Sequence, residues 1–203
     1  MELEFYYHRH ADLLVNHDNI FSSDYNELIN VLIGVTDEDL KQKFITEKTI
    51  KISTKSLAST INSILKKRLE DKKWLSEVGL FKEPPYSKKN KSRWRLDFAK
   101  NNISVEVAFN HQEATAHNIL KPVLASELNH VKKEVQTKLG IVIVATKEMK
   151  KIGNFDGAVG TYESFKEYFK PYNNIITTPI VLIGIKAPKS FKIDKSTKKI
   201  ITK

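Results

Sequence analysis

The feature that most constrains the fold is a pair of alternating segments within residues 93–111, RWRLDFAKNNISVEVAFNH. Apolar and polar residues alternate along residues 94–98 and again along residues 103–109, which is the pattern of half-buried strands. Asn101 and Asn102 separate the two segments, and asparagine tolerates the positive φ that a tight turn needs. The pattern therefore predicts an antiparallel hairpin with its turn at these two asparagines.

This hairpin brings two carboxylates together. With the turn at Asn101–Asn102, the strand register places Asp97 directly opposite Glu106. Cβ atoms at such positions lie about 4.5–5.5 Å apart, and like charges there destabilise a sheet. A divalent cation removes that repulsion, and Mg²⁺ prefers one or two carboxylates together with waters and phosphate oxygens. The spacing leaves a second interpretation open, in which both acids lie on a solvated face beside arginines and lysines.

The rest of the chain predicts the elements that surround the hairpin. Residues 1–82 have mainly helical patterns, and residues 114–138 carry another helical stripe, at Leu120, Leu124, Leu128, Val131 and Val135. The runs GIVIVATK and TPIVLIGI predict buried strands, and TYESFKEYFK between them predicts a short helix that ends before Pro171.

This order of elements predicts the α/β class. We expect a mixed β-sheet in which an antiparallel hairpin is followed by helix-separated strands, with helices on its flanks. The chain length favours one domain over residues 1–203, with its core in residues 93–186. Residues 187–203 form a basic, weakly patterned tail for which we expect partial disorder.

Composition narrows the partners. The formal net charge of +10 indicates a polyanionic partner such as nucleic acid, although a lysine-rich solubilising surface would give the same balance. The chain has no cysteine, which excludes disulfides and thiolate metal sites. The longest apolar runs are far shorter than a membrane span. We therefore expect a cytoplasmic protein without a membrane partner.

The hairpin also carries a resemblance to a known family. Asp97, eight further residues and then Glu106-Val107 on the second strand resemble the PD-(D/E)XK nuclease core. The match is closer to the BglII/BstYI group of type II restriction endonucleases. HADLLVN, LDFAKNNISVEVAF, SELNH and TPIVLIGI resemble segments of that group in the same order, from residue 7 to about residue 186.

The resemblance implies a restriction-endonuclease-like fold and a Mg²⁺-dependent homodimer. Such an enzyme cuts both strands of double-stranded DNA at a short palindrome, here expected to be GATC-centred. Asp97 and Glu106 would bind the metal ion, and the backbone carbonyl of Val107 would be a further ligand. A metal ion in this position polarises the phosphate and lowers the pKa of a bound water.

One position departs from the family pattern. The second residue after the glutamate is usually lysine in PD-(D/E)XK enzymes and glutamine in the BglII-like group, whereas this chain has Ala108. Alanine can neither orient water nor stabilise charge, so either another side chain replaces it or the enzyme is impaired. Lys121 and Glu127, on the helix after the hairpin, are the two candidates. Lys121 could equally be an exposed helix lysine, and Glu127 a buried structural partner.

Three segments are candidates for DNA contact. Asn110 and His111 follow the second strand, where the BglII-like group places base-contacting residues, and a glycine-rich loop contributes Asn154 and Asp156. Asparagine and aspartate also favour turns, so the loop pair has a structural alternative. The basic loop after Pro84 and Pro85 would bind phosphates or would simply be solvated; its cations are Lys88, Lys89, Lys91 and Arg93.

Two rival functions share these residues. A catalytically inactive or repurposed DNA-binding protein would bind DNA without cutting it, which Ala108 makes worth considering. A structure-selective nuclease such as a junction resolvase would use the same carboxylates but ignore sequence. A plasmid digest separates the three cases by discrete fragments, intact DNA, or cutting of branched DNA alone.

Overall fold

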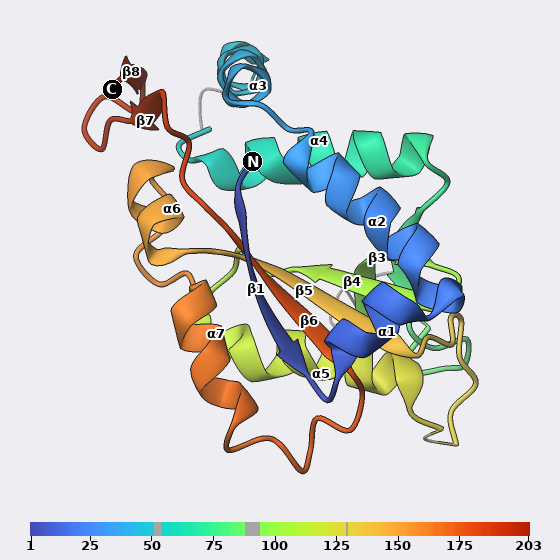
Figure 1. The fold of residues 1–203 in the computed structure, drawn as a ribbon. Helices are drawn as coiled ribbons and strands as arrows, with labels where there is room; N and C mark the ends of the chain where they lie inside the picture. Colours follow the sequence, from blue (N-terminus) through green and yellow to red (C-terminus); the bar gives the residue numbers. More distant parts are fainter. Residues whose placement is uncertain (51–53, 88–93, 129) are drawn as a thin grey trace.

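The computed structural model describes residues 1–50, 54–87, 94–128 and 130–203 (Figure 1). Both helices and strands occur along these ranges, as the α/β prediction requires. In chain order the elements are β1 (Leu3–His8), α1 (Ala11–His17), α2 (Asn19–Ile33), α3 (Asp37–Ile50), α4 (Leu57–Asp71), β2 (Leu75–Gly79), β3 (Arg95–Lys100), β4 (Ile103–Val107), the short 3₁₀ helix η2 (Gln112–Ala114), α5 (Thr115–Ser126), β5 (Leu139–Ala145), α6 (Lys147–Ile152), α7 (Tyr162–Phe169), β6 (Ile180–Ile185), β7 (Phe191–Ile193) and β8 (Ile200–Thr202).

The main sheet has six strands in the order β1-β6-β5-β4-β3-β2. Strands β4, β5 and β6 are parallel to one another. At one edge β1 runs antiparallel to β6, and at the other β3 runs antiparallel to β4 and β2 to β3. Parallel neighbours need crossover connections, and here α5, α6 and α7 provide them. The predicted mixed sheet is therefore confirmed.

The predicted hairpin is formed by β3 and β4. Phe98 pairs with Val105 and Lys100 with Ile103, so the turn falls at Asn101–Asn102 as predicted. Asn101 has a φ of 47°, the left-handed conformation expected of asparagine in such a turn. Asp97 and Glu106 occupy the next position of the same register.

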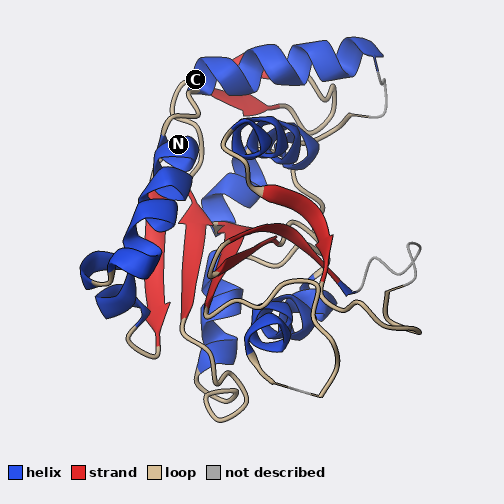
Figure 2. Ribbon diagram, turned by 90° about the vertical axis from the view of Figure 1, so that its right-hand side faces the viewer, coloured by secondary structure: helices blue, strands red, loops and turns tan. Residues whose placement is uncertain are grey.

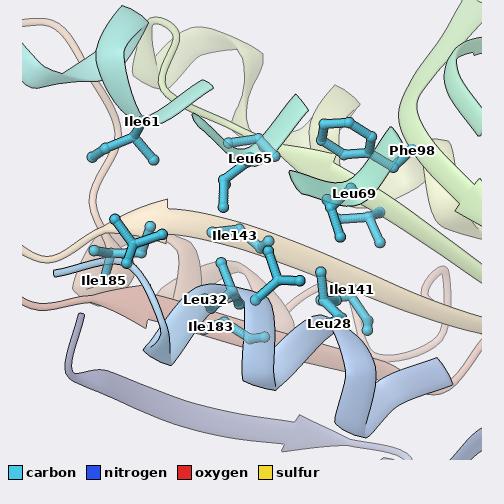
Figure 3. Packing of buried hydrophobic residues seen from close by; sticks show 14 of the residues in the cluster. Leu28, Leu32, Ile61, Leu65, Leu69, Phe98, Ile141, Ile143, Ile183 and Ile185 are labelled. Carbon is cyan, nitrogen blue, oxygen red and sulfur yellow. The ribbon is translucent and has the colours of Figure 1, made fainter. Parts of the chain in front are cut away.

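One face of the sheet is covered by α2 and α4. Helix α4 begins after Ser56, whose side chain accepts a hydrogen bond from the Ala58 N–H, and its predicted apolar stripe is buried. Figure 3 shows Leu28 and Leu32 of α2 and Leu65 of α4 converging with side chains of β5 and β6. This packing fixes α4 above the central strands.

The other face is covered by α5 and α7. Phe165 and Phe169 of α7 and Ile119 of α5 pack against the outward side chains of β5 and β6. Helix α7 begins with a reciprocal capping box between Thr161 and Ser164, which explains why the predicted short helix starts there. The two helical layers on either side of the sheet are visible in Figure 2.

Two strands of the main sheet were not predicted. Residues 1–82 are mainly helical as expected, but they also contain β1 and β2, the two edge strands of the sheet. Strand β1 pairs with β6 along its whole length, from Leu3–Ile185 to His8–Ile180. Its sequence LEFYYH has four consecutive aromatic or histidine positions, so it lacks the alternation that marks β3 and β4.

Two further predictions were wrong. The helical stripe predicted over residues 114–138 ends at Ser126, and Val131 and Val135 instead pack from a loop against a small cluster around Leu80 and Phe81. The C-terminal tail is ordered as the β7–β8 hairpin, which lies beside α3 (Figures 1 and 2). Asp37 of α3 holds it by accepting hydrogen bonds from the backbone N–H and the hydroxyl of Ser190, both 2.8 Å.

Among the described residues, none of the helices combines the length and the apolar character that crossing a membrane would require.

Candidate active site

The two carboxylates predicted from the hairpin lie where β3 and β4 separate. The β3–β4 ladder ends at the Phe98–Val105 pair, so the strands no longer form a regular pair at Asp97 and Glu106. Instead, the Asp97 carboxylate accepts a hydrogen bond of 2.6 Å from the backbone N–H of Val107. This contact fixes the Asp97 side chain against the last residue of β4.

Glu106 is buried and forms an ion pair with Lys121. Its side chain is 3 % exposed, and its Oε1 accepts a hydrogen bond of 2.5 Å from the Lys121 Nζ of α5. Its other oxygen, Oε2, is buried and has no hydrogen-bond partner among the described residues. A buried carboxylate oxygen without a partner is costly, so this atom is the strongest sign that the site takes a ligand.

Burial and the Lys121 charge act in opposite directions on the pKa values of the two acids. Burial and, second, the negative charge of Asp97 raise the pKa of Glu106 to about 8, although Lys121 acts against this. Burial also raises the pKa of Asp97, while the Val107 N–H and the Lys121 charge lower it. A bound cation would lower both pKa values and favour the ionised form of each acid.

The donor set fits a hard divalent cation. Two carboxylates and the carbonyl of Val107 are oxygen ligands, and Glu106 Oε2 is available to bind. Within the ranges that the structure describes, no group of three or more His, Cys, Asp or Glu side chains is arranged as a metal centre. A site with two carboxylates suits a hard divalent cation that retains waters and phosphate oxygens.

Ala108 contributes no polar group to this site. It is fully buried and packs in the cluster formed by α5, α7 and the sheet, next to Ile119 and Val123. Because Ala108 is fully buried, a long polar side chain at this position would have to displace neighbouring side chains. The alanine that replaces the family's lysine or glutamine at position 108 is therefore part of the apolar packing between the sheet and α5.

The two candidate replacements for the missing side chain lie apart. Lys121 reaches the carboxylates, as described above. Glu127 follows the last residue of α5, is exposed, and accepts a hydrogen bond from the hydroxyl of Thr177. Its contacts give no support to the expectation that it joins Asp97 and Glu106.

The structure brings the two predicted base-reading segments together. His111 forms an isolated β-bridge with Val159, and the Gln112 N–H donates to the Ala158 carbonyl over 2.7 Å. The Asn110 and Asn118 side-chain amides also pair, with the Asn118 Nδ2 donating to Asn110 Oδ1 over 2.7 Å. Asn110 and His111 are exposed, so this joined pair of loops offers polar groups to a ligand close to the end of β4.

Asn154 and Asp156 have structural roles within that loop. The Asn154 side-chain amide donates to the Lys55 carbonyl over 2.6 Å, and the Asp156 carboxylate accepts from the Ala158 N–H over 2.8 Å. The Asp156 contact is turn chemistry, one of the two interpretations open from the sequence. Asp156 is exposed, and Asn154 is half-buried. Lys88, Lys89, Lys91 and Arg93 lie outside the described residues.

Sequence patterns missed a group of residues on the Asp97 side. A cavity of about 80 Å³ is lined by Asp97 together with residues of α4 and β2; its other polar lining residues are Asn62, Lys66, Ser76 and Glu77. Strand β2 was not predicted, so nothing placed Glu77 near the hairpin. The register of β2 with β3 is the signal that identifies it, since Ser76 pairs with Phe98 and Val78 with Leu96.

Comparisons with known proteins agree with this fold. The fold is similar to that of restriction endonuclease BglII in a crystal structure with a DNA 16-mer. The two chains superpose with a TM-score of 0.65 at 18 % sequence identity, over 100 % of this chain and 88 % of the other. Free BglII gives a TM-score of 0.53 at 16 % identity, over 91 % of this chain and 79 % of the other. None of the curated proteins compared with this chain matches it.

The family model for restriction endonuclease BglII/BglIII matches residues 3–185, which includes both carboxylates, Lys121 and all six strands of the main sheet. The resemblance found in the sequence motifs is thereby confirmed, and so is the restriction-endonuclease fold. The chain belongs to the BglII/BglIII family of restriction endonucleases and is a type II site-specific deoxyribonuclease.

Proposed function

We propose that this enzyme is a Mg²⁺-dependent homodimer that cuts both strands of double-stranded DNA at a short palindromic site. The observation that carries the proposal is the buried Glu106 carboxylate: Lys121 donates to one oxygen, and the other has no hydrogen-bond partner within the part of the chain that the structure describes. A two-fold dimer suits a palindrome because each subunit reads one half-site.

Asp97, Glu106 and the Val107 carbonyl are the proposed metal ligands. The bound ion would supply Lewis acidity toward the scissile phosphate and a water of lowered pKa. The chain's own contribution is orientation. The Val107 N–H holds the Asp97 carboxylate, and Lys121 holds Glu106 with one oxygen turned away from the lysine.

Lys121 is the proposed replacement for the side chain missing at position 108. Its ammonium group reaches Glu106 from α5 rather than from β4, and its side chain is 10 % exposed. A cation held there stabilises the negative charge that develops on a phosphate during hydrolysis, as a lysine on the strand would. If Lys121 has this role, Ala108 is no longer a reason to prefer the inactive DNA-binding alternative.

Base reading is proposed for the joined loops. Asn110 is suited to adenine, and His111, Asn154 and Asp156 offer further donors and acceptors beside it. Lys88, Lys89, Lys91 and Arg93 are proposed to contact phosphates, which would position the DNA without specifying its sequence. A GATC-centred site is the expectation from the family resemblance.

The first experiment is a digest of a sequenced plasmid with Mg²⁺ and with EDTA, followed by mapping of the fragment ends. Discrete Mg²⁺-dependent fragments are expected, and their ends give the recognition site and the stagger. Intact plasmid that the protein still retards on a gel would overturn the catalytic proposal. Cutting confined to branched DNA would assign a structure-selective nuclease instead.

Two variants test the metal ligands directly. Asp97→Asn and Glu106→Gln keep the size of each side chain but remove its negative charge. Both are expected to abolish cutting while binding to the mapped site persists. Normal cleavage by both variants would contradict the proposed metal site, and a folded-state check by circular dichroism excludes misfolding as the cause of any loss.

A further inference from the structure

Glu77 stands in the same row of the sheet as the two site carboxylates. The β2–β3 register places it opposite Asp97, because the flanking residues Ser76 and Val78 pair with Phe98 and Leu96. Its φ of 53° is the left-handed conformation, which is uncommon for a non-glycine residue inside a strand. Such an outlier is held by its surroundings and tends to accompany a functional site.

Glu77 faces cations rather than a metal cluster. Its Oε1 lies 3.8 Å from the Lys66 Nζ of α4, and its Oε2 lies 3.8 Å from the Arg95 Nη1 of β3. Two cations from different elements therefore converge on one carboxylate. The described residues contain no three-acid metal group, which separates Glu77 from the role of Asp97 and Glu106.

These ion pairs are exchangeable. The side chains of Lys66, Glu77 and Arg95 are 48 %, 57 % and 34 % exposed, and both distances are at the long end for an ion pair. Exposed pairs of this kind contribute little to stability, so another anion can compete with Glu77 for the two cations. Arginine and lysine are the side chains that most often bind phosphate.

The position of Lys66 beside Asp97 favours a DNA phosphate as the competing anion. Lys66 and Glu77 line the same cavity as Asp97, and Asn62 and Ser76 add a side-chain amide and a hydroxyl to its wall. Phosphates follow one another along a DNA strand, so a strand with one phosphate at Asp97 places a neighbouring phosphate within reach of groups on this wall.

The exposed face of α4 continues the polar wall of this cavity toward the N-terminal end of the helix. Toward the beginning of the helix, Lys55, Ser59 and Ser63 line part of a second cavity of about 530 Å³, whose lining also includes Glu47 and Ile50 of α3. Ser59, Asn62, Ser63 and Lys66 are spaced three and four residues apart, so they share one face of the helix. Short hydroxyl and amide side chains there leave room for a sugar-phosphate backbone to approach.

We propose that Lys66 and Arg95 bind a DNA backbone phosphate next to the scissile one, and that Glu77 is the internal counter-ion that this phosphate displaces. The inference rests on the proposed nuclease function and adds a strand-positioning site to it. Glu77 holds the two cations together when DNA is absent. Its negative charge also disfavours the bound strand, so removing that charge strengthens binding.

The test compares DNA binding by Lys66→Gln, Arg95→Gln and Glu77→Gln in EDTA, with a duplex that contains the mapped recognition site. Lys170→Gln is the matched control, because Lys170 is an exposed lysine at the end of α7, on the opposite face of the sheet. Each cation variant is expected to bind roughly fivefold to tenfold more weakly and to reduce the slope of log K against log salt by about one. Glu77→Gln is expected to bind more tightly than the wild type.

The Lys170→Gln control shows how much affinity is lost when any surface lysine loses its charge. If Lys66→Gln and Arg95→Gln have the same affinity and salt slope as Lys170→Gln, the proposed phosphate site is wrong. Loss of cleavage in Glu77→Gln without tighter binding would instead make Glu77 part of the catalytic centre and would overturn its role as counter-ion. In single-turnover cleavage, the cation variants should lose more in apparent affinity than in the rate at saturating enzyme.

These outcomes are separate from failure of the nuclease proposal. If the wild-type protein does not cut the plasmid with Mg²⁺, the proposed function fails, whatever the variants do. If the wild type cuts and the cation variants bind like the control, only the phosphate site fails.

Discussion

Two lysine–glutamate pairs flank Asp97, and they differ in nearly every physical respect. Lys121 and Glu106 lie 2.5 Å apart with side chains 10 % and 3 % exposed, whereas Lys66 and Glu77 lie 3.8 Å apart with side chains 48 % and 57 % exposed. The buried pair is fixed by packing and cannot exchange partners without large cost. The exposed pair is weak, so it can release its lysine to a ligand. A lysine and a glutamate can thus form a fixed pair that positions a catalytic carboxylate, or a weak pair whose lysine is free to bind a ligand instead.

The largest expected effect comes from breaking the buried pair. Lys121→Met should lower the cleavage rate by about 10²–10⁴-fold, the usual range for removing one positioned catalytic group. It should also lower the free energy of unfolding by about 1–3 kcal/mol, because a buried acceptor loses its donor. Single-turnover cleavage and urea unfolding measure the two effects.

Glu127→Ala is the control for that variant, since Glu127 directly follows the same helix but is exposed. Its cleavage rate should stay close to that of the wild type. If Glu127→Ala loses as much activity as Lys121→Met, the lysine is not the replacement for the missing side chain at position 108.

A second prediction concerns the room around the buried pair. Ala108→Gln would place the side chain of the BglII-like pattern into a fully buried position and should lower the free energy of unfolding by about 1–3 kcal/mol through overpacking. Urea unfolding measures this, with Ala158→Gln as an exposed control. Unchanged stability together with faster cleavage would show that α5 leaves more space than its packing indicates.

A third prediction uses a buried ionisable group whose partner is a neutral carbonyl. Burial and, to a smaller extent, the Arg9 charge lower the pKa of His8, although its hydrogen bond with the Ile176 carbonyl opposes this. The unfolded chain therefore takes up the proton first as the pH falls below about 6.5, and the folded protein loses stability there.

His8→Gln should remove this pH dependence because glutamine does not titrate. The free energy of unfolding, measured by urea titration between neutral and mildly acidic pH, should fall less steeply than in the wild type. His17→Gln, at an exposed position, is the control. Equal slopes for the wild type and His8→Gln would contradict the assignment.

The smallest expected effect is on the exposed pair. Lys66→Gln should change the free energy of unfolding by less than about 0.5 kcal/mol, because a long, exposed ion pair contributes little and salt screens it. Thermal unfolding at low and high salt measures this. A loss comparable to that of Lys121→Met would remove the contrast between the two pairs.

The sequence predicted the parts of the site that depend on local pattern. Alternation and the turn asparagines gave the β3–β4 register, and with it the position of Asp97 beside Glu106. The buried strands β5 and β6 and the helix α7 also carried clear local signals. The lysine was identified as a candidate, but its contact with Glu106 depends on how α5 packs on the sheet.

The missed parts depend on tertiary contacts. Strand β2 is short and contains serine, glutamate and glycine, so Glu77 could not be placed opposite Asp97 without the sheet. The apolar repeat beyond Ser126 continues with helical spacing, yet the side chains of Lys133 and Gln136 donate to the Leu124 and Ser126 carbonyls at the end of α5. Val131 and Val135 belong to a loop rather than a helix, and their apolar side chains pack against the cluster around Leu80 and Phe81.

One helix joins the proposed reading of bases to the proposed chemistry. Asn118 pairs with Asn110 of the loop, and Lys121, three residues later on α5, pairs with Glu106. A rise of about 1.5 Å per residue makes these two contacts nearly adjacent along the helix. We expect that a change at Asn110 that alters sequence preference will shift α5 and slow cutting as well. Engineering a new specificity in this scaffold therefore calls for compensating changes on α5, made together with those in the loop.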